Sequence, residues 1–92
     1  MDKFKYISRY SETDEFDNHN RWARICYYNN LPICWISKRK HGDVIYFQVN
    51  DYFPSINSDT PNYCGIELMK DFEEIKIDLE NRFTKFLFII NN

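Results

Sequence analysis

Glycine and proline are scarce in this sequence of 92 residues, which contains two of the first and three of the second. Phosphate-binding loops need clustered glycines, and Gly42 and Gly65 lie far apart, so no such loop is expected. Long apolar runs are missing too, because the longest, residues 86–90, is much shorter than the roughly 18–20 residues of a membrane span. The first ten residues, MDKFKYISRY, have no apolar core of a signal peptide. We therefore expect no contact with a membrane.

A disulfide framework is also not expected, because the three cysteines are an odd number at uneven spacing: Cys26, Cys34 and Cys64. This favours a cytoplasmic protein with reduced thiols. The cysteines and the two histidines match no zinc-binding spacing, so we expect neither a metal nor a cofactor. A small enzyme with a Cys–His pair stays open as an alternative, because such pairs assemble in space and not in sequence.

A strong charge of either sign is absent as well. The formal net charge is −2, whereas a nucleic-acid-binding domain of this size usually has a clear basic excess. The apolar fraction of 43% and the charged fraction of 28% are typical of a folded globular protein, and the length predicts one domain over residues 1–92. What the sequence does have is aromatic residues, at 18% of the chain. Tyrosine and tryptophan are favoured in binding surfaces, so some of them are expected outside the core.

Alternating polar and apolar residues predict several strands. Residues 3–10 have the pattern of a half-buried strand, and residues 22–28, 33–38 and 44–49 predict a three-stranded antiparallel meander. Asn29-Asn30 and residues 40–43 are the expected turns, because asparagine and glycine tolerate positive φ. Residues 11–20 predict a loop or a short helix, and residues 50–65 predict a long surface loop.

The period changes to that of a helix in the last third of the chain. The apolar residues recur every three or four positions and predict an amphipathic helix over residues 66–83: Leu68, Phe72, Ile75, Leu79 and Phe83. Residues 84–90 are nearly all apolar and predict a closing strand. The expected fold is therefore α+β, with an antiparallel sheet of four to five strands and one main helix packed on it.

An acidic stripe accompanies the apolar face of this predicted helix, at spacings of four, three and four: Glu67, Asp71, Glu74 and Asp78. Like charges at such spacings repel, so helix stability alone does not favour the arrangement. One hypothesis is that the stripe enters a basic groove of a partner, where carboxylates take the place of phosphates. The alternative is a solvated face, partly neutralised by Lys70, Lys76 and Arg82.

Two further charged clusters each allow two interpretations. The acids of the 11–20 segment form either caps and turns or a second contact surface: Glu12, Asp14, Glu15 and Asp17. The basic run at the tip of a predicted hairpin is either solvated or a nucleic-acid contact, with nearby aromatic residues to stack on bases. The residues of that second alternative are Arg24, Trp35, Lys38, Arg39 and Lys40.

The end of the chain, IELMKDFEEIKIDLENRFTKFLFIINN, resembles that of small immunity proteins that neutralise nuclease toxins such as colicins. The resemblance lies in the pattern from Ile75 to Phe86 and covers about the last quarter of the chain. It implies an inhibitor that fills the active cleft of a toxin with acidic and aromatic side chains. Phage-encoded inhibitors of host defence systems have the same profile: short, cytoplasmic, rich in aromatic residues and without catalytic motifs.

The leading hypothesis is thus a non-enzymatic inhibitor that binds a protein, either a toxic nuclease or a component of a defence system. Its expected contact residues are the acidic stripe, with Tyr52, Phe53 and Tyr63 of the predicted loop as aromatic anchors. The alternative function is a small nucleic-acid-binding module that uses the basic hairpin tip.

Overall fold

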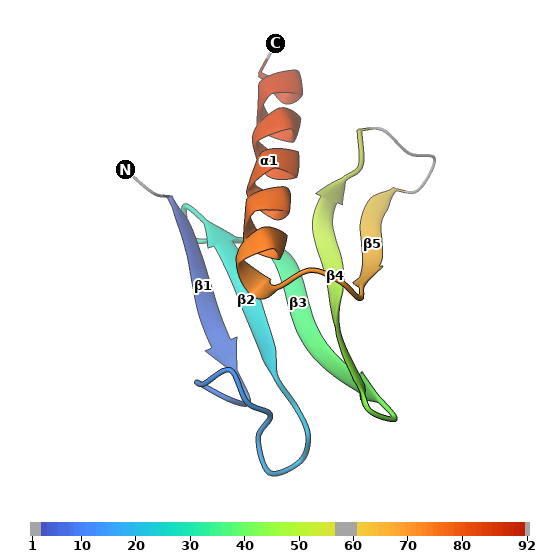
Figure 1. Ribbon diagram of the computed structural model, residues 1–92. Coiled ribbons are helices and arrows are strands. Elements are labelled where there is room, and N and C mark those ends of the chain that lie inside the picture. The colour runs from blue at the N-terminus through green and yellow to red at the C-terminus, as the bar shows by residue number, and fades with distance from the viewer. Residues whose placement is uncertain (1–2, 57–60, 92) are drawn as a thin grey trace.

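The computed structural model describes residues 3–56 and 61–91 and has an α+β fold. Within these residues, five strands precede one helix along the chain (Figure 1). They are β1 (Phe4–Arg9), β2 (Ala23–Tyr28), β3 (Leu31–His41), β4 (Val44–Pro54), β5 (Asn62–Glu67) and α1 (Phe72–Ile90).

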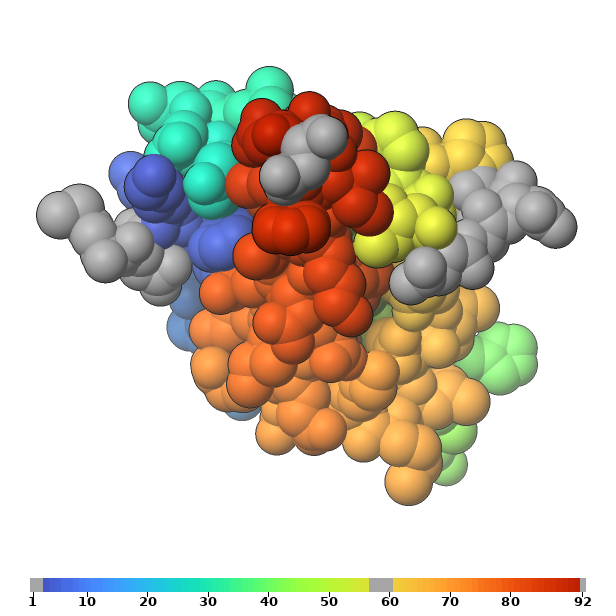
Figure 2. All heavy atoms as spheres, turned by 90° about the horizontal axis from the view of Figure 1, so that it is seen from above, coloured from blue at the N-terminus to red at the C-terminus, as the bar shows by residue number. Residues whose placement is uncertain are grey.

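The strands form one antiparallel sheet in the order β1-β2-β3-β4-β5, so each strand pairs with its neighbours in sequence. Asn29, Asn30 and Gly42 have φ values of 49°, 68° and 61°, which tight hairpin turns require and these residue types tolerate. The helix lies across one face of the sheet (Figure 1). Seen from above, it lies between β1 and the edge formed by β4 and β5 (Figure 2). The opposite face is not covered by any element that the structure describes.

The helix begins at a capping box. The Asp71 side chain accepts a hydrogen bond from the Glu74 backbone N–H at 2.9 Å, and the Glu74 side chain accepts one from the Asp71 backbone N–H at 3.4 Å. These two bonds satisfy donors that the first helical turn leaves open. Ile75, Leu79 and Phe83 follow on the buried face of the helix and pack against the sheet.

Aromatic rings fill much of the core between helix and sheet. The ring centroid of Phe83 lies 4.9 Å from that of Tyr28, 5.0 Å from that of Phe53 and 6.1 Å from that of Phe4. Near the start of the helix, a second group of rings is in contact: Trp22, Phe47 and Phe72. Such aromatic pairs contribute about 0.5–1.5 kcal/mol each beyond their buried area.

The predicted fold class is confirmed, and so are four of the five predicted strands, of which β3 and β4 are longer than expected. The alternative of a short helix in residues 11–20 is wrong, because residues 11–22 form a loop that leads into β2. Ser11 and Thr13 hold this loop: their carbonyl oxygens accept hydrogen bonds from the buried Arg24 side chain at 2.8 and 2.9 Å, and that of Thr13 also accepts one from Trp22 Nε1.

Three expectations for the last third of the chain are wrong. Residues 62–67 are strand β5 and do not belong to a long loop, while residues 57–60 of that predicted loop lie outside the described residues. The helix begins at Phe72 and not at residue 66, because the capping box at Asp71 sets its start. Residues 84–90 are its last turns and not a strand, because Phe86 and Leu87 continue the apolar helix face and no glycine or proline interrupts it.

Candidate functional site

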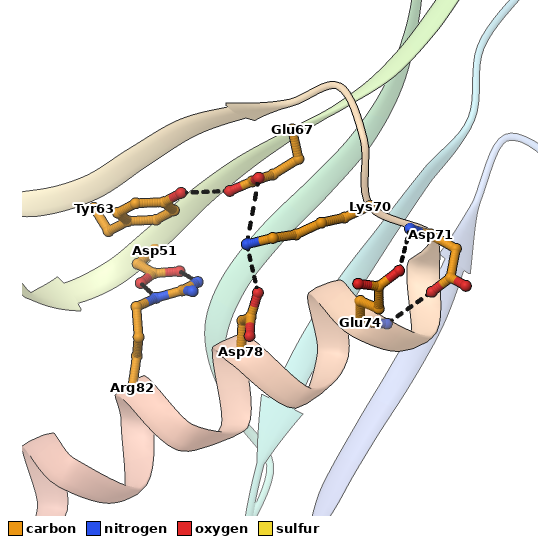
Figure 3. Close-up of polar contacts among 8 residues, drawn as sticks. All are labelled: Asp51, Tyr63, Glu67, Lys70, Asp71, Glu74, Asp78 and Arg82. Carbon is orange, nitrogen blue, oxygen red and sulfur yellow. Dashed lines mark hydrogen bonds and ion pairs between the residues drawn. The ribbon is translucent and has the colours of Figure 1, made fainter.

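The acidic stripe is divided between a strand and the helix, and each of its carboxylates has a partner within the protein (Figure 3). Glu67 ends β5 and accepts a hydrogen bond from the Tyr63 hydroxyl at 2.6 Å. Lys70 forms ion pairs with Glu67 at 3.5 Å and with Asp78 at 2.7 Å. The other two acids, Asp71 and Glu74, form the capping box. Glu67 and Asp78 therefore link β5 to α1 through Lys70, and Asp71 and Glu74 cap the helix. All four residues have a structural role.

A buried ion pair lies beside this network. Asp51 on β4 has a side chain only 1% exposed, and it accepts hydrogen bonds from Arg82 Nε at 2.8 Å and Arg82 Nη2 at 3.0 Å. Burial alone would lower the pKa of Arg82, but the hydrogen bonds and the charge of Asp51 raise it. The Arg82 guanidinium also lies 4.3 Å from the Tyr63 ring centroid. Burial and the hydrogen bond to Glu67 raise the pKa of Tyr63 to about 12.

The three aromatic anchors expected beside the stripe do not form one surface with it. Phe53 is in the core, 5.0 Å from Phe83 between ring centroids. Tyr63 is half-buried against Arg82 on the helix side. Tyr52 is exposed, and it follows Asp51 in β4, so it projects from the face opposite α1. Of the three, Tyr52 alone is on an open surface.

One residue of the second acidic cluster, Asp14, lies beside the start of the helix. Asp14, Asp71 and Glu73 line one hollow of about 350 Å³ together with Lys38. The Lys38 ammonium donates to the Asp14 carbonyl oxygen and lies 4.8 Å from the Trp22 ring centroid. Burial lowers the pKa of Lys38, and Asp14 opposes that shift. The loop and the helix start are thus adjacent, with Lys38 between them.

The residues of the nucleic-acid alternative fall into two groups. Arg24 is buried, where it donates to backbone carbonyl oxygens and lies 4.1 Å from the Trp22 ring centroid. With Lys38, it has a structural role at the loop. Trp35, Arg39 and Lys40 line a surface pocket, and Lys38 contributes to its wall as well.

The face of the sheet opposite α1, here called the open face, carries a row of side chains across all five strands. The register aligns Ile7, Ile25, Trp35, Asn50 and Cys64 in this row. Neighbouring rows of the same face add Tyr27, Tyr46, Tyr52 and Ile66. Ile66 is 62% exposed and Tyr52 51% exposed. The open face is therefore a broad apolar and aromatic surface in contact with solvent.

Charge is distributed unequally between the two faces of the sheet. The described strands contain two acidic residues, Asp51 and Glu67, and both lie on the helix side. The open face has cationic residues instead: Lys5, Arg9 and Arg39. The net charge of −2 averages over these two surfaces, which is why composition alone did not reveal them.

A pocket of about 500 Å³ adjoins the open face at the end where α1 begins. It lies between the 10–22 loop and the β3–β4 hairpin, beside the part of β3 that extends beyond β2. Its lining has aromatic and cationic side chains and no carboxylate: Tyr10, Asn20, Arg21, Trp22, Trp35, Ser37, Lys38, Arg39, Lys40 and Gly42. This set is here called the basic pocket.

Comparison with known proteins gives no assignment: no family model, no curated protein and no solved structure matches this chain. Within the described residues, no group of three or more His, Cys, Asp or Glu side chains is placed to hold a metal ion. The same part of the chain has no helix that is long and apolar enough to cross a bilayer.

The cysteines differ in their surroundings. Cys34 is buried and donates a hydrogen bond to Asp51 Oδ1 at 3.3 Å. Burial and the negative charge of Asp51 raise the pKa of Cys34, so its thiol stays protonated at neutral pH and is a poor nucleophile. Cys64 is exposed on the open face, where its thiol donates to Asn50 Oδ1 at 2.8 Å.

Several residues of the open face and the basic pocket were not among those expected to bind a partner. Ile7 and Ile66 occupy the open face, and Tyr10 and Arg21 line the pocket. The alternating pattern of residues 3–10 places Lys5, Ile7 and Arg9 on one face of a strand. In a two-layer fold one face of the sheet can remain uncovered, so this pattern was a signal that these residues are exposed. Ile66 gave no such signal, since it was assigned to the helix.

Proposed function

We propose that this protein is a non-enzymatic inhibitor that binds a protein partner through the open face of its sheet. The observation that supports this most is the exposure of that face: tyrosines, a tryptophan and isoleucines lie in adjacent rows across five strands, with α1 on the other side. Tyrosine, tryptophan and arginine are the residues in which binding energy concentrates at protein interfaces. Apolar patches of this kind mark interaction sites on small proteins.

The chemistry of the face favours a partner surface that is apolar with acidic groups around it. Lys5, Arg9 and Arg39 would face those groups, which gives complementary charge. A second copy of the chain would bring the same cations opposite one another. A nucleic-acid strand would cross β4 and β5, whose residues on this face include Gln48, Asn50 and Ile66 and carry no cation.

The profile of the whole sequence supports the inhibitor class. The chain is short and aromatic-rich, as in immunity proteins and phage inhibitors of host defence, and its odd number of cysteines favours the cytoplasm. The acidic residues first expected to contact the partner are engaged in the fold, so the proposed contact surface lies on the opposite side of the sheet. Tyr52 remains a proposed contact residue.

Capture from a lysate of the native host with the immobilised full chain tests this proposal. Ile66→Glu places a charge in the open face, whereas Ile77→Glu makes the same change on the exposed side of α1, where Ile77 is 60% accessible. We expect one protein to be retained by the wild type and by Ile77→Glu, and to be reduced at least about tenfold by Ile66→Glu. Nuclease treatment of the lysate removes partners that are bridged by nucleic acid.

A separate variant tests whether the acidic stripe, and not the open face, is the contact surface. Reversal of Asp78 to lysine changes the charge of the stripe without touching the capping box. Loss of the captured protein with Asp78→Lys, and its retention with Ile66→Glu, would show that the stripe is the interface and that the open face is not.

A further inference from the structure

The basic pocket concentrates cations around aromatic rings. Arg21 lies 4.5 Å from the Tyr10 ring centroid, and the Tyr10 and Trp35 rings meet edge-on at 6.4 Å. Tyr10 is exposed and Trp35 is half-buried, so ring surface remains accessible to a ligand. Tyr10 also adopts a positive φ of 74°, which is uncommon for a bulky residue and places it at the turn that leaves β1.

The charges of the pocket are only partly neutralised. Arg21 pairs with Asp17 at 3.0 Å. Arg39 and Lys40 are exposed, and within the described residues neither forms an ion pair with a carboxylate. A pocket with accessible cations, and with no acid in its wall, attracts an anion.

A buried hydroxyl in the pocket wall is a second and independent sign of a polar ligand. Ser37 lines the pocket and is only 6% exposed, and among the described residues its Oγ has no hydrogen-bond partner. A buried hydroxyl without a partner is unfavourable, and native proteins contain few of them. The ligand is therefore expected to bring a polar group to the part of the pocket wall that Ser37 lines.

We infer that the basic pocket binds a nucleotide, with the base against the Trp35 and Tyr10 rings and the phosphate at Arg39 and Lys40. A planar ring, an anionic group and hydrogen-bonding atoms in one ligand match the three features of the wall. The volume of about 500 Å³ is within the usual range of ligand pockets. The nucleotide belongs either to a single strand of DNA or RNA or to a free mononucleotide, since both present the same groups. This inference does not depend on protein binding by the rest of the open face.

Fluorescence anisotropy with a labelled eight-nucleotide oligothymidylate tests the site on the full chain at low salt. We expect saturable binding, and a loss of affinity of about threefold to tenfold for each of Arg39→Gln and Lys40→Gln because each removes a phosphate contact. Ser37→Ala is expected to weaken binding about threefold through the lost hydrogen bond. Trp35→Leu is expected to weaken it at least about fivefold by removing a stacking surface, with circular dichroism to verify the fold.

Lys5→Gln is the matched control, because Lys5 is an exposed cation of the open face that pairs with Tyr27 at the other end of β2 and does not line the pocket. It removes the same charge and should leave the affinity within about twofold of the wild type, whereas purely non-specific attraction would be reduced equally by all three lysine and arginine variants.

Competition separates the two sources of the nucleotide. Displacement of the oligonucleotide by millimolar adenosine or thymidine monophosphate would assign the site to a free nucleotide, and displacement by unlabelled oligonucleotide alone would assign it to a strand. The inference is overturned if no probe binds at a protein concentration of about 100 µM, or if Lys5→Gln and Arg39→Gln weaken binding to the same degree. Ile66→Glu should leave nucleotide binding intact, so failure here is distinguishable from failure of the protein-binding proposal.

Discussion

At the scale of single residues, Gly65 allows the close packing of Tyr63. An added Cβ at Gly65 would lie 2.1 Å from Tyr63 Oη and 2.5 Å from its Cζ, which is far inside van der Waals contact. Tyr63 has little freedom to move away, because its hydroxyl donates to Glu67 and its ring contacts Arg82. The glycine is thus needed for space and not for a special backbone angle.

Gly65→Ala is therefore expected to destabilise the protein by about 1–3 kcal/mol, the usual cost of overpacking. The methyl group must displace the Tyr63 ring, and this breaks the hydrogen bond to Glu67. Urea denaturation followed by tryptophan fluorescence measures the free energy of unfolding. The control is the same substitution in a Tyr63→Ala background, where the ring is absent and the alanine should cost much less. An equal cost in both backgrounds would show that the ring is not the cause.

At the scale of elements, Asp71 acts as the N-cap of α1. Its carboxylate accepts from the first turn of α1, and an asparagine side chain can accept the same hydrogen bond without the charge. Asp71→Ala is expected to lower the free energy of unfolding by about 0.5–2 kcal/mol, and Asp71→Asn by much less. Thermal denaturation at neutral pH measures both variants. Equal destabilisation by the two would mean that the charge near the helix start matters and that the cap does not.

The elements also show what the sequence could predict. Strong alternation and the Asn29-Asn30 turn correctly predicted the meander, because these signals are local. The predicted start of the helix was wrong for a physical reason. The apolar period of the helix extends back to residues 66–68, yet pairing with β4 makes residues 62–67 a strand. Residues 84–90 were predicted to be a strand and are helical. A short apolar run alone does not distinguish a buried strand from a helix.

The candidate sites needed the arrangement of the elements and could not be read from residue types alone. The acidic stripe was visible as a spacing, but its ion pairs with Lys70 depend on the position of β5 beside α1. The basic pocket joins residues of the 10–22 loop and of the β3–β4 hairpin, which are distant in sequence. The sequence predicts Trp35, Lys38, Arg39 and Lys40 as possible nucleic-acid contacts, and all four line the pocket. Tyr10, Arg21 and Ser37 join them only through the fold of the loop and the register of the sheet.

At the scale of the whole molecule, the fold presents two unlike surfaces. The side with α1 holds the carboxylates of Asp51, Glu67 and the helix, mostly paired with cations. The open face is apolar with cations around it. Because charges act over a Debye length of about 8–10 Å, a molecule at the open face would meet its cations and would be largely screened from the carboxylates of the other side.

The attachment of α1 to the edge strand β1 provides a pH-dependent test of the two-layer structure. The Tyr6 hydroxyl on β1 donates to Glu80 on α1 at 2.7 Å, and the Tyr6 ring packs edge-on against Phe72. Burial, and then the hydrogen bond to Glu80, raise the pKa of Tyr6 well above the ordinary value of 10.0. Above pH 10, the unfolded chain releases the Tyr6 proton and the folded protein retains it, so the free energy of unfolding must fall.

Below pH 10 this contribution is fully present, and the loss begins as the pH rises through the ordinary tyrosine value. The fall per group approaches about 1.4 kcal/mol for each pH unit above that point. Tyr6→Phe removes one titrating group from both states, so its free energy of unfolding should fall less steeply than that of the wild type between pH 10 and 11.5. Urea denaturation at half-unit pH steps measures both slopes, and lysine deprotonation is a common background to the two proteins. Parallel slopes would show that Tyr6 ionises as easily in the folded protein as in the unfolded chain, and that β1 is not held to α1 by a buried hydroxyl.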